Sequence, residues 1–188
     1  MNKPLINYIV AFFFILSSNA LEDLNGLKVR SAAFIPTSGL LRNIYHAAGP
    51  CIELEYTRRV KNQLEVWGNF DYFWDKGSSL GLCSPTKIII LNASSGIKFP
   101  CFFQRCQEIY LGIGGSIGGV LITNTSCCKK EKTSKPAMGI LVKSGYSYCF
   151  SRHACLDFFV DYIYQPAYFQ RQVDVGGTRI GIGLGGTF

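Results

Sequence analysis

The residues that could support catalysis are few, because the 188-residue chain has only two histidines, His46 and His153. Neither histidine has a serine and a carboxylate arranged around it as an evident catalytic triad. His46 could form a hydrolytic pair with Ser38 or Thr37, and an acidic pair, Asp71 and Asp75, could lie beside it. The run G-I-G-G-S-I-G-G lies inside an alternating segment and opens no helix, so it does not predict a phosphate loop. We therefore predict no enzymatic activity, no metal and no cofactor.

Eight cysteines are the second chemical feature of the chain. Their spacing matches no zinc-binding pattern, so they favour disulfides over a metal site. The two pairs that could each staple a short turn are Cys101 with Cys106 and Cys149 with Cys155. The adjacent Cys127 and Cys128 cannot readily pair with each other, which leaves intermolecular disulfides as an alternative.

Basic residues give the chain a formal net charge of +7, and several lysines cluster after Cys128. We predict a surface basic loop within Ile122–Pro136, carrying Lys129, Lys130, Lys132 and Lys135. Such a loop could bind phosphates, glycans or an acidic partner, or be a solvated tip. A basic excess of this size is no nucleic-acid signature, and we predict no nucleic-acid partner.

The elements that position these residues are strands, because apolar residues recur at every second position. Eight such segments predict an all-β fold, and most have the length of strands that cross a bilayer at a tilt. They are Leu27–Ile35, Cys51–Thr57, Gln63–Phe73, Thr86–Phe99, Gln107–Leu121, Ala137–Cys149, Ala154–Tyr164 and Gln172–Phe188. The connections alternate between long and short, which is typical of an antiparallel up-and-down transmembrane β-barrel with long external loops and short periplasmic turns.

The two faces of the predicted strands differ in charge. One face is almost free of charged residues in its central spans, as a lipid-facing surface requires, since a mid-membrane Arg or Lys costs ~2–4 kcal/mol. The other face predicts a polar network that fills the lumen, because unpaired buried charges are expensive. The predicted network consists of Arg30, Glu53, Glu55, Glu65, Asp71, Lys143, Asp157, Asp161 and Arg179.

The two ends of the chain carry further signals. Lys3, an apolar run from Leu5 to Leu16 and small residues up to Ala20 predict a cleaved signal peptide over residues 1–20, which leaves residues 21–188 for the barrel. The last strand alternates down to the terminal aromatic residue, and its apolar stripe predicts an assembly signal. The residues of that stripe are Ile180, Ile182, Leu184 and Phe188.

The eight alternating strands, the F-I-P-T-S-G entry to the first loop and the G-I-G-L-G-G-T-F ending resemble one bacterial family. This is the small outer-membrane β-barrel family of opacity proteins, the OmpA transmembrane domain and OmpW-like proteins. The cysteine content is similar to that of envelope proteins of chlamydia-like bacteria. One departure is Gly186, which stands where members often carry an aromatic residue.

The resemblance implies a multi-pass outer-membrane location, insertion by the barrel-assembly machinery, and contact with membrane lipid and lipopolysaccharide. It also implies a structural or surface-interaction role, in adhesion or envelope integrity, in which loops contact host surfaces or other envelope proteins. The alternative is a narrow porin-like channel for small or hydrophobic solutes. A third class, a lipid A-modifying enzyme, would depend on His46.

Overall fold

The computed structural model describes residues 25–61, 63–78, 85–104, 106–126, 129–151, 154–169 and 171–188. The predicted signal peptide at residues 1–20 lies outside the described residues, as do Cys83, Cys127 and Cys128.

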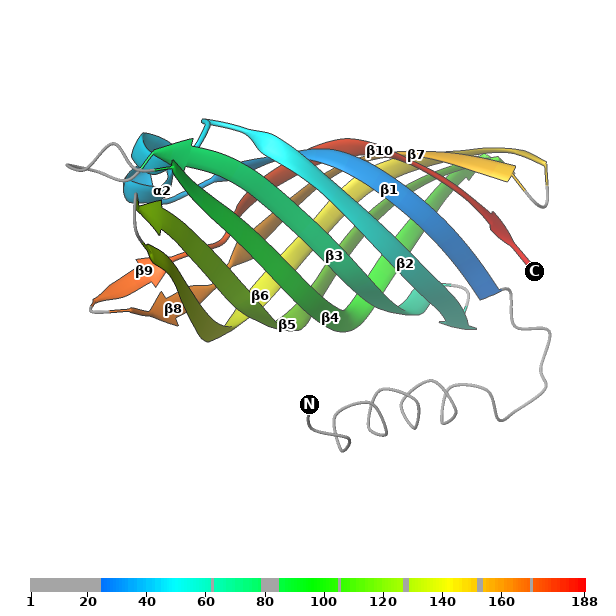
Figure 1. Cartoon of the computed structure of the whole chain (residues 1–188). Coiled ribbons are helices and arrows are strands. Elements are labelled where there is room, and N and C mark those ends of the chain that lie inside the picture. Colours follow the sequence, from blue (N-terminus) through cyan, green and yellow to red (C-terminus); the bar gives the residue numbers. More distant parts are fainter. Residues whose placement is uncertain are drawn as a thin grey trace.

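Eight long antiparallel strands close into a barrel, which confirms the predicted fold class (Figure 1). They are β1 (Asn25–Pro36), β2 (Gly49–Lys61), β3 (Leu64–Ser78), β4 (Pro85–Gln104), β5 (Gln107–Ser126), β6 (Lys129–Ser151), β7 (Ala154–Tyr164) and β10 (Gly177–Thr187). The ring follows the chain and is closed where β10 pairs with β1, from Gly26 opposite Thr187 to Pro36 opposite Gly177. Phe188 continues this closure, because its backbone exchanges hydrogen bonds of 2.8 and 3.0 Å with Asn25.

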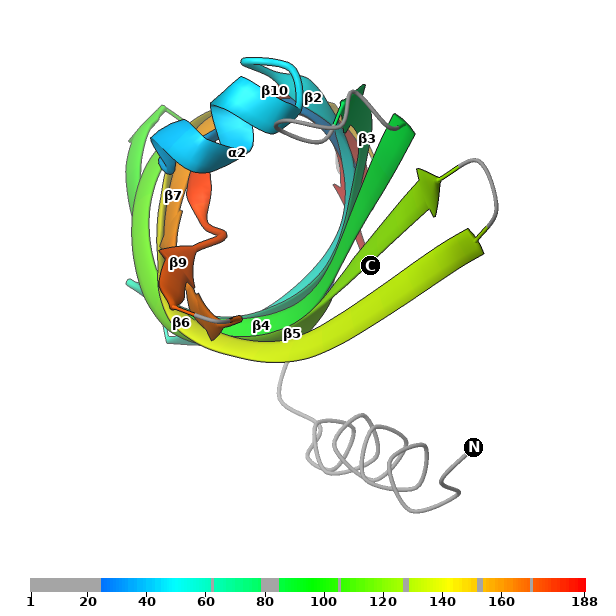
Figure 2. The same ribbon diagram turned by 60° about the vertical axis from the view of Figure 1, so that its left-hand side comes forward.

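The two ends of the barrel differ. We call the end with the short β2–β3, β4–β5 and β6–β7 connections the turn end; Phe188 also lies there. The opposite loop end carries the helix α2 (Gly39–Ile44) and a small hairpin of β8 (Pro166–Tyr168) and β9 (Gln172–Asp174). Figure 2 shows α2 lying across the loop end, with the tips of β5 and β6 extending beyond the ring of strands.

Alternation along the strands places apolar side chains outside and polar side chains inside. Exposed outward-facing residues from all eight strands include Val29, Ile52, Phe70, Leu91, Ile113, Val142, Phe158 and Ile182. The predicted assembly residues Ile180, Ile182 and Leu184 lie on this outer surface, and Phe188 is exposed directly after the strand. In a soluble barrel the faces would be inverted, with charge outside and an apolar interior.

Several predicted boundaries were wrong. The first loop contains α2, and the predicted eighth strand, Gln172–Phe188, is broken after Asp174 into β9 and β10. The basic loop within Ile122–Pro136 is mostly strand, because β5 and β6 stay paired from Ile122 opposite Thr133 to Ser126 opposite Lys129. All four lysines of the predicted loop, Lys129, Lys130, Lys132 and Lys135, therefore belong to β6. Pairing of the two strands thus continues beyond Leu121, and Ile122 packs against the buried apolar cluster.

The apolar part of the core lies at the loop end, where α2 packs against side chains from several strands. Leu41 and Tyr45 lie in the same buried cluster as Phe34, Phe73 and Ile88. Burial raises the pKa of Tyr45, whose hydroxyl lies 3.2 Å from the Thr86 hydroxyl. Within the described residues, no helix is long and apolar enough to cross a membrane.

Candidate functional site

A cluster of ion pairs fills the centre of the barrel; we call it the lumen network. It consists of the basic residues Lys28, Arg30, Lys98, Lys143 and Arg179 and the acidic residues Glu53, Glu55, Asp71, Asp157 and Asp161. All except Lys28 are buried. Because the two signs balance, the lumen does not hold a large net charge at its centre, and each buried ion has partners within reach.

Arg30, on β1, lies at the middle of the lumen network. Its guanidinium lies 2.9 Å from Glu55 and 2.7 Å from Asp157, and it donates a 2.5 Å hydrogen bond to the hydroxyl of Tyr110. The cation also lies 4.5 Å from the ring centroid of Phe159. Arg30 therefore links β1 to strands on the opposite side of the barrel.

Two lysines from other strands share the carboxylates of β2. The ammonium of Lys143, on β6, lies 2.7 Å from Glu53 and 2.5 Å from Glu55. Lys98, on β4, donates a 3.0 Å hydrogen bond to the other oxygen of Glu55. Each carboxylate of β2 thus holds cations from several strands, and the pairing works as a crosslink through the lumen.

Towards the loop end, Arg179 extends the lumen network. Its guanidinium lies 3.1 Å from Asp71 and 3.3 Å from Glu53. Asn92 donates a 2.9 Å hydrogen bond to Asp71 and accepts one of 2.9 Å from Gln165. The polar groups therefore continue up to the apolar cluster beneath α2.

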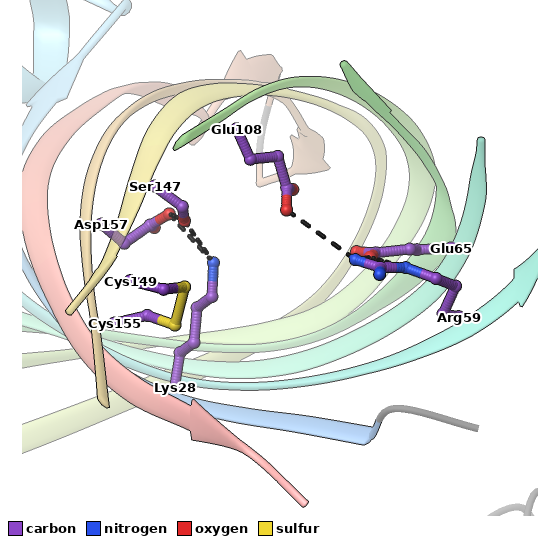
Figure 3. Close-up of a disulfide and its surroundings, with 8 residues drawn as sticks. All are labelled: Lys28, Arg59, Glu65, Glu108, Ser147, Cys149, Cys155 and Asp157. Carbon is purple, nitrogen blue, oxygen red and sulfur yellow. Dashed lines mark hydrogen bonds and ion pairs between the residues drawn. A yellow bond between two sulfur atoms is a disulfide. The ribbon is translucent and has the colours of Figure 1, made fainter. Parts of the chain in front are cut away.

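At the turn end the polar contacts divide into two groups (Figure 3). Lys28 donates hydrogen bonds of 2.8 Å to Ser147 and 3.0 Å to Asp157. Across the mouth, Glu65 accepts bonds of 3.0 and 2.7 Å from Arg59, whose guanidinium lies 3.9 Å from Glu108. Glu65, a member of the predicted lumen network, therefore pairs with Arg59 at the turn-end mouth.

Large side chains fill the rest of the lumen. Trp67 is fully buried and donates to the carbonyl of Ile97 at 3.1 Å, with the ammonium of Lys143 4.5 Å from its ring centroid. The ring packs on Gly114, where an added Cβ would lie 2.6 Å from it, so this position needs glycine. Two small cavities among the described residues measure about 10 and 40 Å³, which is room for roughly one and three waters.

The cysteines of the turn end do not all pair. Cys149 and Cys155 face each other across β6 and β7 and form a disulfide. Cys101 and Cys106 are exposed free thiols, which differs from their predicted pairing. The reason is register: β4 continues to Gln104, so Cys101 lies opposite Ile109 and not opposite Cys106.

The candidate catalytic residues are not brought together as a triad. His46 donates its backbone N–H to Asp75 at 3.0 Å, and its Nδ1 lies 2.8 Å from the same carboxylate. Ser38 is the N-cap of α2, so the whole six-residue helix lies between it and His46. Asp71 lies in the lumen beside Arg179. Among the described residues, no group of three metal-binding side chains is present.

Several residues that make lumen contacts are absent from the predicted network, among them Lys98, Tyr110 and Arg59. Lys98 and Tyr110 are buried and contact Glu55 and Arg30, and Arg59 pairs with Glu65 at the rim. The alternation of β4 and β5 already places Lys98 and Tyr110 on the inner face. Arg59 carried no such signal, because it was assigned to a turn that is in fact the end of β2.

Lysines form a row on the outer surface near the loop end; we call it the lysine row. Lys76 on β3 lies opposite Lys87 on β4, Lys87 lies opposite Thr123 on β5, and Thr123 lies opposite Lys132 on β6. All three lysines are exposed. The next outward-facing row towards the turn end contains Trp74, Ile89 and Leu121. The lysine row therefore borders the apolar outer surface.

A closed eight-stranded barrel with an apolar exterior and an ion-paired lumen defines a transmembrane β-barrel. More narrowly, the chain has the fold of the small bacterial outer-membrane β-barrels, as the following solved structures show. The outer membrane protein OprG of Pseudomonas aeruginosa has a TM-score of 0.65 at 14% identity, over 88% of this chain and 95% of OprG. Ail, the attachment invasion locus protein of Yersinia pestis, has a TM-score of 0.58 at 15% identity, over 88% of this chain and 99% of Ail.

Neisserial surface protein A has a TM-score of 0.57 at 16% identity, over 88% of this chain and 96% of that protein. No protein-family model and no curated protein sequence matches the chain. None of these findings supports the similarity to envelope proteins of chlamydia-like bacteria.

Proposed function

We propose that this chain is an integral protein of a bacterial outer membrane, with a structural or surface-interaction role and no catalytic one. The observation that carries the proposal is the polarity of the barrel, which is the opposite of that expected for a soluble barrel. Apolar side chains cover its outside, and ion pairs fill its inside. In this proposal residues 1–20 are a cleaved signal peptide, and the barrel-assembly machinery inserts the chain through β10. The turn end faces the periplasm and the loop end faces outside, as in other barrels of this class.

A filled lumen favours the structural role over the narrow channel. Arg30, Trp67, Tyr110, Lys98 and Lys143 are all buried in the interior and line neither of the two small cavities described above. An eight-stranded barrel leaves just enough room for such side chains. Buried side chains therefore occupy the space that a solute would need.

We expect the purified barrel to show no stable single-channel conductance in planar lipid bilayers, because ion pairs and aromatic rings occupy the lumen. The matched control is a Trp67→Ala/Tyr110→Ala double variant, which removes two of the largest buried rings and should raise conductance if the lumen is the path. Stable conductance of the wild-type protein would instead support a narrow channel.

The lysine row supports a role in contacting anionic groups at the outer surface. Its three lysines point outward directly beyond the apolar surface, at the level where phosphate groups of lipopolysaccharide would lie. Lysines near an anionic membrane surface contribute about 1 kcal/mol each. Ail was solved in complex with the heparin analogue sucrose octasulfate. We propose lipopolysaccharide phosphates as the partner here, because the row borders the apolar surface that lipid covers.

Replacing Lys76, Lys87 and Lys132 together with glutamine should weaken lipopolysaccharide binding by on the order of 100-fold at low salt. Titration of the detergent-solubilised barrel with lipopolysaccharide measures the effect, and Lys61→Gln at the turn end is the control, because Lys61 is also exposed. Unchanged lipopolysaccharide binding together with lost heparin binding would favour a host glycan and contradict the lipid assignment.

A further inference from the structure

Three cysteines lie side by side at the turn end: two on β6 and β7, and one, Cys106, directly before β5. Cys155 on β7 lies opposite Cys149 on β6, to which it is disulfide-bonded. On the other side of β6, the pairing of Gln107 with Tyr148 places Cys106 next in register, opposite Cys149. The backbone confirms this placement, because Cys149 donates its N–H to the carbonyl of Cys106 at 2.8 Å.

The third cysteine of this row is a free, exposed thiol beside a disulfide. Directly opposite residues of a hydrogen-bonded antiparallel pair have Cα atoms about 5.5 Å apart. This separation lies within the roughly 4.4–6.8 Å that a disulfide spans. Cys149 therefore lies within bonding reach of two partners, Cys155 and Cys106, and can be bonded to only one of them at a time.

The surroundings of the disulfide give the sulfur atoms room and a nearby positive charge. Cys149 and Cys155 both line the cavity of about 40 Å³ at the turn-end mouth, together with Glu108, Lys28 and Arg59. Figure 3 shows Lys28 reaching past the disulfide towards Ser147 and Asp157. Cys106 lies two positions before Glu108, so strand alternation places it towards this same mouth.

We propose that Cys106, Cys149 and Cys155 form a thiol–disulfide exchange site, in which the bond moves from Cys149–Cys155 to Cys106–Cys149. Cys106 loses its proton to water, and its thiolate attacks the sulfur of Cys149. The Cys149–Cys155 bond breaks as the Cys106–Cys149 bond forms, and Cys155 leaves as a thiolate that takes a proton from water. One disulfide and one thiol are present before and after, so no oxidant or reductant is needed.

The exchanged bond crosslinks a longer stretch of chain. Cys149 and Cys155 are 6 positions apart, whereas Cys106 and Cys149 are 43 positions apart. Because closing a longer loop removes more entropy from the unfolded chain, the longer crosslink stabilises the folded barrel more against unfolding. The exchange moves the covalent link from the β6–β7 turn to the pair β5 and β6, which encloses the whole extended hairpin.

The test follows the disulfide in the full-length mature chain, folded in detergent without added thiol. The protein is incubated at pH 8.5, quenched with acid, alkylated, and digested with trypsin and chymotrypsin. Cleavage after Arg105, Tyr110 and Arg152 separates the three cysteines from one another and from Cys101. Mass spectrometry should show the Cys106–Cys149 crosslink growing with time to at least a tenth of the total, with alkylation of Cys155 growing in parallel.

Two single variants make the result specific. Cys106→Ser should keep only the Cys149–Cys155 bond, and Cys155 should stay unalkylated. Cys101→Ser, which removes the other exposed thiol of the same hairpin, should exchange as the wild type does. Heat-modifiable gel migration checks that each variant is folded. The proposal is overturned if the wild type keeps only Cys149–Cys155 after a day at pH 8.5, or if Cys101→Ser blocks exchange as Cys106→Ser does.

Discussion

Replacing Arg30 with methionine is expected to lower the free energy of unfolding by about 3–5 kcal/mol, a large part of the stability of a typical domain. The guanidinium is fully buried and lies within 3.4 Å of four carboxylates, those of Glu53, Glu55, Asp157 and Asp161. Removing it leaves these anions with fewer cations in a site that water hardly reaches. Urea unfolding of the micelle-folded barrel, followed by tryptophan fluorescence, measures the loss.

The size of the loss in unfolding free energy for Arg30→Met distinguishes a lumen network that excludes water from one that water reaches. Lys76→Met, at an exposed position, is the control and should change the free energy of unfolding by less than about 0.5 kcal/mol. Adding Asp157→Asn to Arg30→Met should recover part of the loss, because one uncompensated charge is removed. A loss below about 1 kcal/mol for Arg30→Met would mean that the lumen is open to water, since screening then replaces the ion pairs.

The substitution Ile113→Arg is expected to have the second large effect. It tests whether the outer surface of the barrel contacts lipid. Ile113 is half exposed on β5 between Ile97 and Val142, which are also exposed, so all three should contact lipid. A charge there should cost about 2–4 kcal/mol if the position lies near the membrane centre. The free energy of unfolding from lipid vesicles measures this cost, and the folded fraction should fall in parallel.

The matched control is arginine at Thr123, on the same strand and the same outer face but within the lysine row. Near the membrane interface the cost should fall to about 0–1 kcal/mol. Equal costs at the two positions would contradict the proposed position of the membrane boundary along β5. A negligible cost at both would show that this face does not contact lipid.

The sequence by itself was sufficient to predict the eight-stranded barrel. Apolar and polar residues alternate along each strand, and this alternation depends only on which face of the strand meets lipid. Each buried member of the predicted network lies on an inner face, since alternation assigns Glu53, Asp157 and Arg179 without knowledge of their partners. Lys98 lies on the same kind of face and could have been added by the same rule. Arg59 could not, because its strand assignment depended on where the β2–β3 turn falls.

The tertiary structure alone decided which of these residues meet. Arg30 and Asp157 are 127 positions apart, and only closure of β10 on β1 brings them to 2.7 Å. The two candidate cysteine pairs had similar spacings, yet register placed Cys149 opposite Cys155 and left Cys101 opposite Ile109. The lysine row and the three-cysteine row likewise follow from register across several strands. Local pattern determines the face on which a residue lies, but the hydrogen-bonded register determines its neighbours.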